Sequence, residues 1–120
     1  MLRTFPLLIA ALAMCACQRA TEVEVLSSQR SPDGVRDAVV EEHIYGPHFG
    51  GEAPAVEVHI RKVVGPNSEA GMVFQAPSAN GKVSVHWLSA QRLEVVHSTS
   101  QAPTVFQSVY DGIQVQRRVE

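Results

Sequence analysis

The chain has 120 residues with 10 basic and 12 acidic side chains, a formal net charge of −2, which fits one small domain. It contains no basic patch and no run of like charges, so nucleic acid is not an expected partner. From Cys17 onward the chain holds 18 Val but only 3 Leu and 3 Ile. Because valine suits the pleated surface of a strand better than a helix, this composition predicts an all-β domain.

The N-terminus has the pattern of an export signal. Arg3 precedes an apolar run of about nine residues from Phe5 to Ala13, within the length typical of a signal peptide. A membrane-spanning helix needs about 20 apolar residues, and polar residues follow this run at once. The sequence therefore predicts export to an oxidising compartment.

The end of the signal, Met14-Cys15-Ala16-Cys17, resembles the lipobox of bacterial lipoproteins, whose terminal Cys is lipidated and becomes the first mature residue. Cys17 is the better candidate because the small Ala16 precedes it, and Cys15 is the alternative. Both cysteines of the chain lie at this junction. In an exported protein, cysteines with no partner elsewhere in the chain favour lipidation over a structural disulfide.

This resemblance implies a signal peptide over 1–16 and a tether over 17–22, which leaves 23–120 for the β domain that the composition predicts. It also implies a membrane anchor through the N-terminal lipid, and Gln18 after the lipidated Cys favours the periplasmic face of the outer membrane. The alternative is ordinary cleavage after Ala13, which would release a soluble periplasmic protein.

Alternating apolar and polar residues predict strands separated by turns. A first strand begins at Val23, and the turn Ser31-Pro32-Asp33-Gly34 ends it. Asn80-Gly81 and Asp111-Gly112 are hairpin signals. The further predicted strands are Asp37 to Ile44, Ala55 to Val64, Met72 to Gln75, Lys82 to Leu88, Arg92 to Ser98, Val105 to Tyr110 and Ile113 to Val119.

Seven or eight strands joined by tight turns, without a helical pattern between them, predict a single antiparallel domain. A sandwich, a partly open barrel and a curled meander all remain open at this point.

Two short motifs carry a further resemblance. The SPDG turn at residues 31–34, followed by an apolar strand, resembles the repeats of periplasmic β-propellers, and the stretch from Trp87 to Val96 resembles a degenerate second copy. The chain is too short for the four blades that a propeller needs. The whole mature region is more similar to short bacterial lipoproteins of an uncharacterised family, which combine a lipobox, one SPDG turn and a late W-L-S hairpin. That resemblance implies no activity.

The candidate metal ligands are histidines and one glutamate on predicted strands. Glu57, His59 and His86 fall on the faces opposite the main valine rows, and His43 or His97 would join them if the strands are neighbours. Three such ligands would suit zinc or copper. No spacing such as HxH or HExxH fixes them, however, which favours solvent-facing histidines on amphipathic strands. We therefore expect no metal or other cofactor.

No catalytic residue is identified. The serines lack a nucleophile-elbow motif, and Glu41 and Glu42 are adjacent on one strand, so they point to opposite faces and cannot act as an acid–base pair. The best candidate contact surface is the Gly- and Pro-rich loop with Tyr45, His48 and Phe49.

The sequence thus favours a membrane-anchored cell-envelope lipoprotein that acts as a binding or structural module, with an envelope protein as its partner and without enzymatic activity. The alternative is a periplasmic metal-binding or small enzymatic domain that uses a histidine-bearing sheet face.

Overall fold

The computed structural model describes residues 21–45, 54–64 and 70–120, and these residues form nine strands and one short 3₁₀ helix. The strands are β1 (Thr21–Arg30), β2 (Arg36–Tyr45), β3 (Ala55–Lys62), β4 (Ala70–Pro77), β5 (Val83–Ser89), β6 (Arg92–His97), β7 (Val105–Phe106), β8 (Val109–Tyr110) and β9 (Ile113–Val119), and the helix η4 is Ser78–Asn80. The all-β prediction is therefore confirmed. In this part of the chain no helix is long and apolar enough to cross a membrane.

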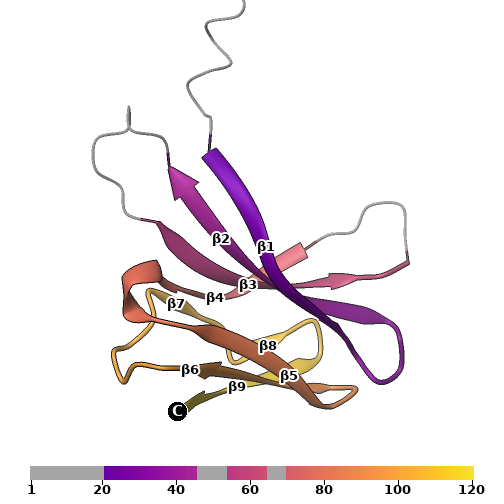
Figure 1. Cartoon of the computed structure of the whole chain (residues 1–120). Helices are drawn as coiled ribbons and strands as arrows, with labels where there is room; N and C mark the ends of the chain where they lie inside the picture. Colours follow the sequence, from indigo (N-terminus) through magenta and orange to yellow (C-terminus); the bar gives the residue numbers. More distant parts are fainter. Residues whose placement is uncertain (1–20, 46–53, 65–69) are drawn as a thin grey trace, which may run out of the picture.

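The strands form two sheets that lie one over the other (Figure 1). The first sheet has the order β1-β2-β3-β4-β7 and the second has the order β5-β6-β9-β8. Of the three architectures that the sequence left open, the structure is a two-sheet sandwich.

The core lies between the two sheets and is made mainly of valine. Alternate residues point inward along most of the sandwich, as the period-2 pattern predicts, and the bulge in β4 is an exception. The largest fully buried side chains include Phe74 and Ile60 from the first sheet and Leu93 and Ile113 from the second. Trp87 and Tyr110 pack against the same cluster at its edge. Burying both inner faces stabilises the described part of the chain, which contains no cysteine.

One strand pair differs from the antiparallel prediction: β6 and β9 are parallel, while the other pairs are antiparallel. The predicted strand Val105–Tyr110 is in fact two short strands that belong to different sheets. The chain leaves β6, adds β7 to the first sheet, and returns through β8 before the last hairpin. After this excursion between the sheets, β8 runs opposite to β6, and the last hairpin reverses the chain again, so β9 runs parallel to β6. Local alternation of residues does not reveal this.

The two strongest turn predictions are confirmed, and one hairpin signal is wrong. Gly34 has φ 75° in the SPDG turn, and Asp111 and Gly112 have φ 51° and 80°, as a type I′ hairpin requires. Asn80-Gly81, in contrast, does not join two paired strands. Here η4 and Gly81, with φ 111°, carry the chain from β4 in one sheet to β5 in the other.

The pairing of β2 with β3 decides what the outer face of the first sheet carries. Glu41 lies directly opposite Glu57, while Val40 lies opposite Val58 and both of these valines are buried in the core. Because successive side chains alternate between faces, Glu41 and Glu57 point away from the core, and so do the histidines two residues further along each strand.

Candidate metal centre

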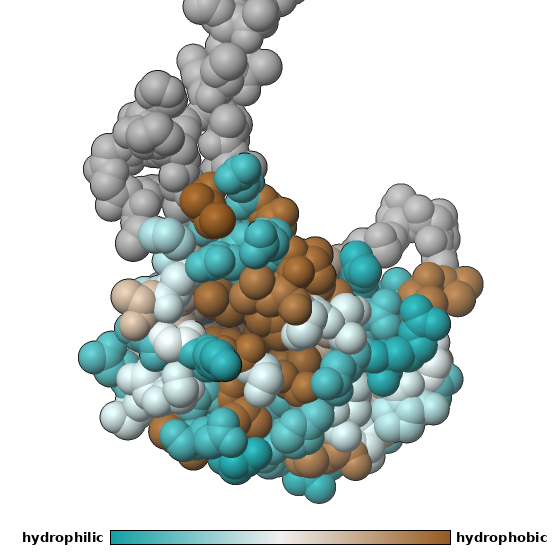
Figure 2. Space-filling view, viewed as in Figure 1, coloured by the Kyte–Doolittle hydropathy of each residue, from teal (hydrophilic) through white to brown (hydrophobic). Residues whose placement is uncertain are grey.

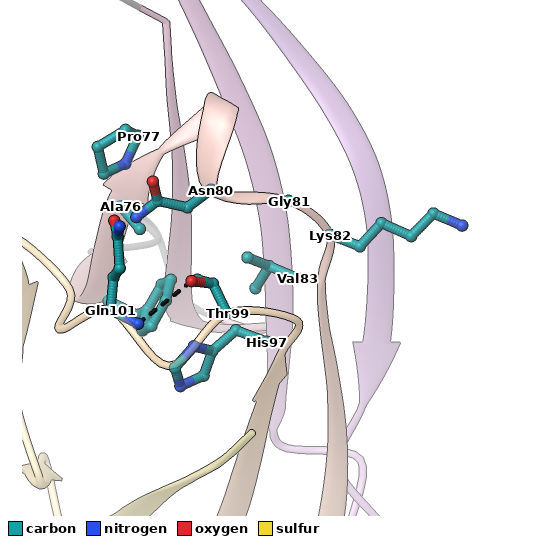
Figure 3. A pocket seen from close by; sticks show the side chains of 10 residues that line it. Ala76, Pro77, Asn80, Gly81, Lys82, Val83, His97, Thr99 and Gln101 are labelled. Carbon is teal, nitrogen blue, oxygen red and sulfur yellow. Dashed lines mark hydrogen bonds between the residues drawn. The ribbon is translucent and has the colours of Figure 1, made fainter. Parts of the chain in front are cut away.

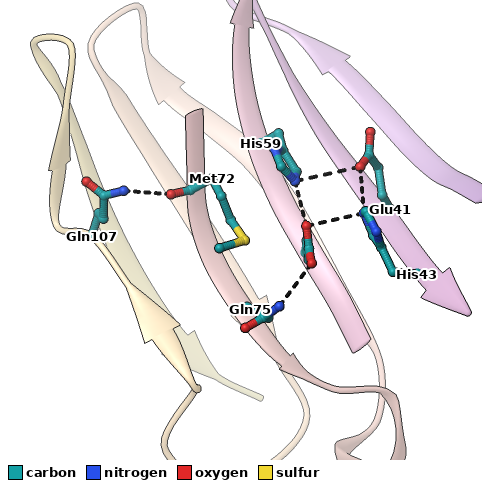
Figure 4. Close-up of polar contacts among 7 residues, drawn as sticks. Glu41, His43, His59, Met72, Gln75 and Gln107 are labelled. Atoms are coloured by element: carbon teal, nitrogen blue, oxygen red, sulfur yellow. Dashed lines mark hydrogen bonds and ion pairs between the residues drawn. The ribbon is translucent and has the colours of Figure 1, made fainter. Parts of the chain in front are cut away.

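Four side chains on the outer face of the first sheet place their ligand atoms close together: Glu41 and His43 from β2, and Glu57 and His59 from β3. These atoms all lie within 4.8 Å of one another. The close-up in Figure 4 shows the two histidines turned toward the carboxylates between the strands. We call these four residues the His/Glu cluster.

The contacts within the His/Glu cluster alternate between nitrogen and oxygen. Nε2 of His59 lies 2.8 Å from Oε1 of Glu57 and 3.6 Å from Oε1 of Glu41. Nε2 of His43 lies 3.1 Å from Oε1 of Glu41 and 3.2 Å from Oε1 of Glu57. The imidazole rings are stacked, with centroids 6.3 Å apart and an interplanar angle of 23°. Each histidine therefore directs one ring nitrogen at both carboxylates.

The His/Glu cluster is withdrawn from solvent. The side chain of Glu57 is only 10% exposed, and the side chains of the other three residues are 20–21% exposed. Two carboxylates this close together repel each other, and a buried carboxylate is retained only when a cation or hydrogen bonds compensate it. With neutral imidazoles the four ligands carry a charge of −2, which a divalent cation would neutralise.

A neighbouring strand holds the central carboxylate in position. Gln75 of β4 lies directly opposite Glu57, and its Nε2 donates a 2.9 Å hydrogen bond to Oε2 of Glu57 (Figure 4). Oε1 is left to the two histidines. This is the arrangement of an outer-shell partner, which fixes a ligating carboxylate while leaving one oxygen free to bind.

The spacing of the donor atoms fits a small transition-metal ion. A four-coordinate ion with bonds of about 2.0–2.2 Å to nitrogen and oxygen separates neighbouring ligands by roughly 3.3–3.5 Å in a tetrahedron. Three of the four nitrogen–oxygen distances of the cluster, 2.8, 3.1 and 3.2 Å, are shorter than that value, and the fourth, 3.6 Å, is slightly longer. Small movements of the side chains would open enough room for the ion.

The neighbouring strands flank the His/Glu cluster with apolar side chains. On β1, Val23 lies opposite His43 and Val25 lies opposite Glu41. On β4, Met72 lies opposite His59. Val23 and Val25 are 50% and 58% exposed, whereas Leu26 at the β1 bulge, which is 48% exposed, lines a cavity between the two sheets. The space-filling view shows apolar side chains gathered on the face that carries β1 (Figure 2).

His86, a predicted ligand, lies elsewhere. It belongs to β5 in the second sheet, where its Nε2 lies 2.7 Å from Oε1 of Glu94. Burial raises the pKa of Glu94, but hydrogen bonds from Gln116 and Arg118 outweigh this effect and leave the pKa below its usual range. The sequence had placed His86 correctly on the face opposite Val85, but that face belongs to the other sheet, so His86 and His59 do not share a site.

His97 does not reach the His/Glu cluster either. Its side chain is 3% exposed, and its ring packs against Phe74 with centroids 5.5 Å apart. It lines a narrow crevice beside Gly81 and Thr99, and Figure 3 shows the ring under the loop that carries Thr99 and Gln101. Nε2 of His97 is buried without a hydrogen-bond partner among the residues that the structure describes. His97 is therefore a core residue.

The structure does not test the remaining predicted site residues. Cys15, Cys17, His48 and Phe49 fall outside the described residues. Tyr45 is the last residue of β2. The lipidation site and the contact loop therefore remain predictions.

Sequence analysis had missed Glu41 as a candidate ligand and had offered His43 only as a conditional one. A signal was present, because Glu41-Glu42-His43 and Glu57-Val58-His59 are two copies of the pattern Glu-x-His on consecutive predicted strands. Consecutive strands usually pair, and antiparallel pairing of two such patterns gathers two carboxylates between two imidazoles. Only the register, with Glu41 opposite Glu57, decides that they meet.

Comparisons of the chain with protein-family models, with curated proteins and with solved structures found no match. The resemblance to bacterial lipoproteins therefore remains a prediction, and a functional conclusion has to be argued from the geometry of the molecule.

Proposed function

We propose that this protein is a metal-binding domain of the bacterial cell envelope, and that the His/Glu cluster holds one Zn²⁺ or Cu²⁺ ion. The observation that carries the proposal is the convergence of two imidazole nitrogens and two carboxylate oxygens within 4.8 Å on one sheet face. Imidazole and carboxylate are ligands that both ions accept. The export signal supplies the location, as a prediction from the sequence.

Three further features support this proposal. The ligands come from two paired strands rather than from loops, so their backbone positions are fixed by the sheet. Gln75 orients the central carboxylate. The least exposed of the four ligands, Glu57, is a group that is rarely buried unless a cation or hydrogen bonds compensate it.

The test is calorimetric titration of the metal-free chain with Zn²⁺ and, separately, with Cu²⁺. We expect one ion per chain. His59→Ala and Glu57→Gln should each weaken binding at least tenfold, because loss of even an outer-shell partner typically costs about 10–100-fold in metal affinity. Glu57→Gln keeps the side-chain shape, so its effect reports the lost charge.

His86→Ala is the matched control. Like His59, His86 contacts a buried glutamate through Nε2, but it lies on the other sheet. It should leave the affinity unchanged. No binding by the wild-type chain, or equal weakening by His86→Ala and His59→Ala, would contradict the proposal.

A separate observation favours a second function, the membrane-anchored binding module that the sequence suggests. Strand β1 is ten residues long and forms one edge of its sheet, whereas the opposite edge strand, β7, has only two residues. Proteins normally protect long edge strands, because their unpaired backbone groups attract another strand. With three exposed apolar residues, β1 is suited to pair with an extended segment of an envelope protein.

The test is site-specific photo-crosslinking in cells that express the full chain. A crosslinker at position 25, on β1, should give an adduct of defined mass. The control is position 109 on β8, where Val109 is 60% exposed and therefore equally accessible. Adducts at both positions, or at neither, would contradict a specific β1 partner. An adduct of twice the chain's own mass would identify a second copy instead of an envelope protein and would also contradict it.

A further inference from the structure

The two sheets leave a cavity between them on the side of the sandwich where the edge strands β1 and β5 lie. Its volume is about 610 Å³, and small-molecule sites typically measure roughly 300–1,000 Å³. The two edge strands meet at one end, where Nε1 of Trp87 donates a 2.9 Å hydrogen bond to the carbonyl of Gln29. Toward the start of β1 they diverge (Figure 1), and the cavity lies in this opening.

Apolar side chains line the cavity from both sheets. Val56 of β3 is only 5% exposed, and Val83 comes from β5 in the second sheet. Leu26 reaches the cavity because the pairing of β1 with β2 shifts between Val25 and Ser27, so Leu26 is the extra residue of a bulge. Figure 2 shows apolar side chains gathered between β1 and β5. Leu26 is 48% exposed, so its side chain is available to a ligand.

Carboxylates give the wall formed by the first sheet a negative charge. Glu42 lines the cavity, and Glu24 lies directly opposite Glu42 on β1, so the two side chains share the inner face. Like charges in this arrangement destabilise a sheet. Within the described ranges, no ion pair joins either glutamate to a basic residue. Glu120 and Lys82 also line the cavity, which leaves an excess of negative charge.

We propose that this cavity binds an amphipathic cation, a small molecule that combines an alkyl chain with an ammonium group. The alkyl chain packs against Leu26, Val56 and Val83, and the ammonium group lies near Glu42 and Glu24, where it offsets their mutual repulsion. The site is on the inner face of β2, on the opposite side of the sheet from the His/Glu cluster, so it does not depend on the proposed metal-binding function. The alternative is a cavity that holds only water.

The test is calorimetric titration of the metal-free chain with decyltrimethylammonium, below the concentration at which it forms micelles. Decyl sulfate has the same alkyl chain with a negative head group, and tetramethylammonium has the head group without the chain. We expect one decyltrimethylammonium ion per chain. Decyl sulfate and tetramethylammonium should each bind roughly tenfold more weakly or worse, because one is repelled by the carboxylates and the other buries little apolar surface.

Two substitutions locate the binding site. Leu26→Ala removes part of the apolar wall, and Glu42→Gln removes a charge but keeps the side-chain shape. Each should weaken decyltrimethylammonium binding by roughly threefold or more. Leu88→Ala is the matched control, because Leu88 is 44% exposed and lies on β5 but does not line the cavity. It should leave the affinity unchanged.

The outcomes decide this proposal separately from the metal site. Equal affinities for decyltrimethylammonium and decyl sulfate would show that charge plays no part, and equal weakening by Leu26→Ala and Leu88→Ala would place the ligand elsewhere; either result overturns the proposal. The absence of any decyltrimethylammonium binding also overturns it. If the wild-type chain binds decyltrimethylammonium as expected but does not bind Zn²⁺ or Cu²⁺, the proposed metal-binding function fails and the cavity proposal stands.

Discussion

Gly71 is a residue whose small size the packing of the two sheets requires. It lies opposite Ile60 on the inner side of β4, and the ring of Tyr110 from the second sheet covers it. A Cβ built at Gly71 would overlap the ring carbons and the hydroxyl of Tyr110. Glycine normally weakens a strand, so here the close approach of the ring explains its presence.

We therefore predict that Gly71→Ala destabilises the domain by about 1–3 kcal/mol, the usual cost of overpacking, even though alanine is the better strand residue. The measurement is the midpoint of urea unfolding. In a Tyr110→Ala background the added methyl group has room, so most of the cost should vanish. Equal costs in both backgrounds would show that the ring is not the cause.

At the scale of elements, an ion pair connects the two sheets. Arg36, at the start of β2, donates from Nη2 to Oδ2 of Asp111 at 3.0 Å. Asp111 lies in the turn between β8 and β9 of the other sheet. The hydrogen bond from Arg36 lowers the pKa of Asp111 below its usual range. The stability that this ion pair contributes therefore depends on pH.

The direction of this dependence follows from linkage. The pKa of Asp111 is lower in the folded chain than in the unfolded chain. Its contribution to the free energy of unfolding is therefore complete above the unfolded pKa of about 3.9, and it is lost as the pH falls through the folded pKa. Asp111→Asn removes the charge but keeps a residue that suits the type I′ turn.

We expect the wild-type chain to be more stable than Asp111→Asn at pH 6, and this difference to shrink toward pH 2. Thermal unfolding at several pH values measures it. Asp33, whose pKa the hydrogen bond from Ser31 lowers, stays in both chains, so only their difference is informative. A difference that does not change with pH would contradict the assignment.

Local sequence patterns predicted which face of a strand a residue occupies, but not which sheet the strand belongs to. Alternation correctly placed Glu57 and His59 on the face opposite Val58, and Asp111-Gly112 correctly predicted the last hairpin. The pattern could not assign strands to sheets, so His86 was grouped with His59 although the two lie in different sheets. Sheet membership depends on contacts between distant segments, which a period of two residues does not encode.

Bulges limit prediction further. Between Val58 and His59 the pairing of β3 with β4 shifts by one residue, and this shift leaves both Val73 and Phe74 buried while Met72 and Gln75 face outward. A strict alternation through β4 would place either Met72 or Gln75 in the core. The bulge thus brings two neighbours of the His/Glu cluster, Met72 and Gln75, to one face, and no local signal in the sequence marks it.

At the scale of the whole molecule, the proposed metal site would couple metal binding to folding. Its ligands lie on β2 and β3, whose inner faces supply Val40 and Val58 to the shared core. Unfolding the sandwich separates these strands, so an ion bound between them would be released. When a ligand that binds only the folded chain is present at a concentration of 100 times its dissociation constant, it stabilises that chain by about 2.7 kcal/mol.

We therefore predict that excess Zn²⁺ raises the thermal midpoint of the wild-type chain by roughly 10–20 °C, since about 1 kcal/mol corresponds to 4–8 °C in a domain of this size. The same shift should appear in His86→Ala, which leaves the cluster intact, and should be absent in His59→Ala. Differential scanning calorimetry with and without the metal measures all three chains. Because the shift requires an ion bound between β2 and β3 in the folded state, an equal rise in His59→Ala would place the bound zinc elsewhere on the molecule.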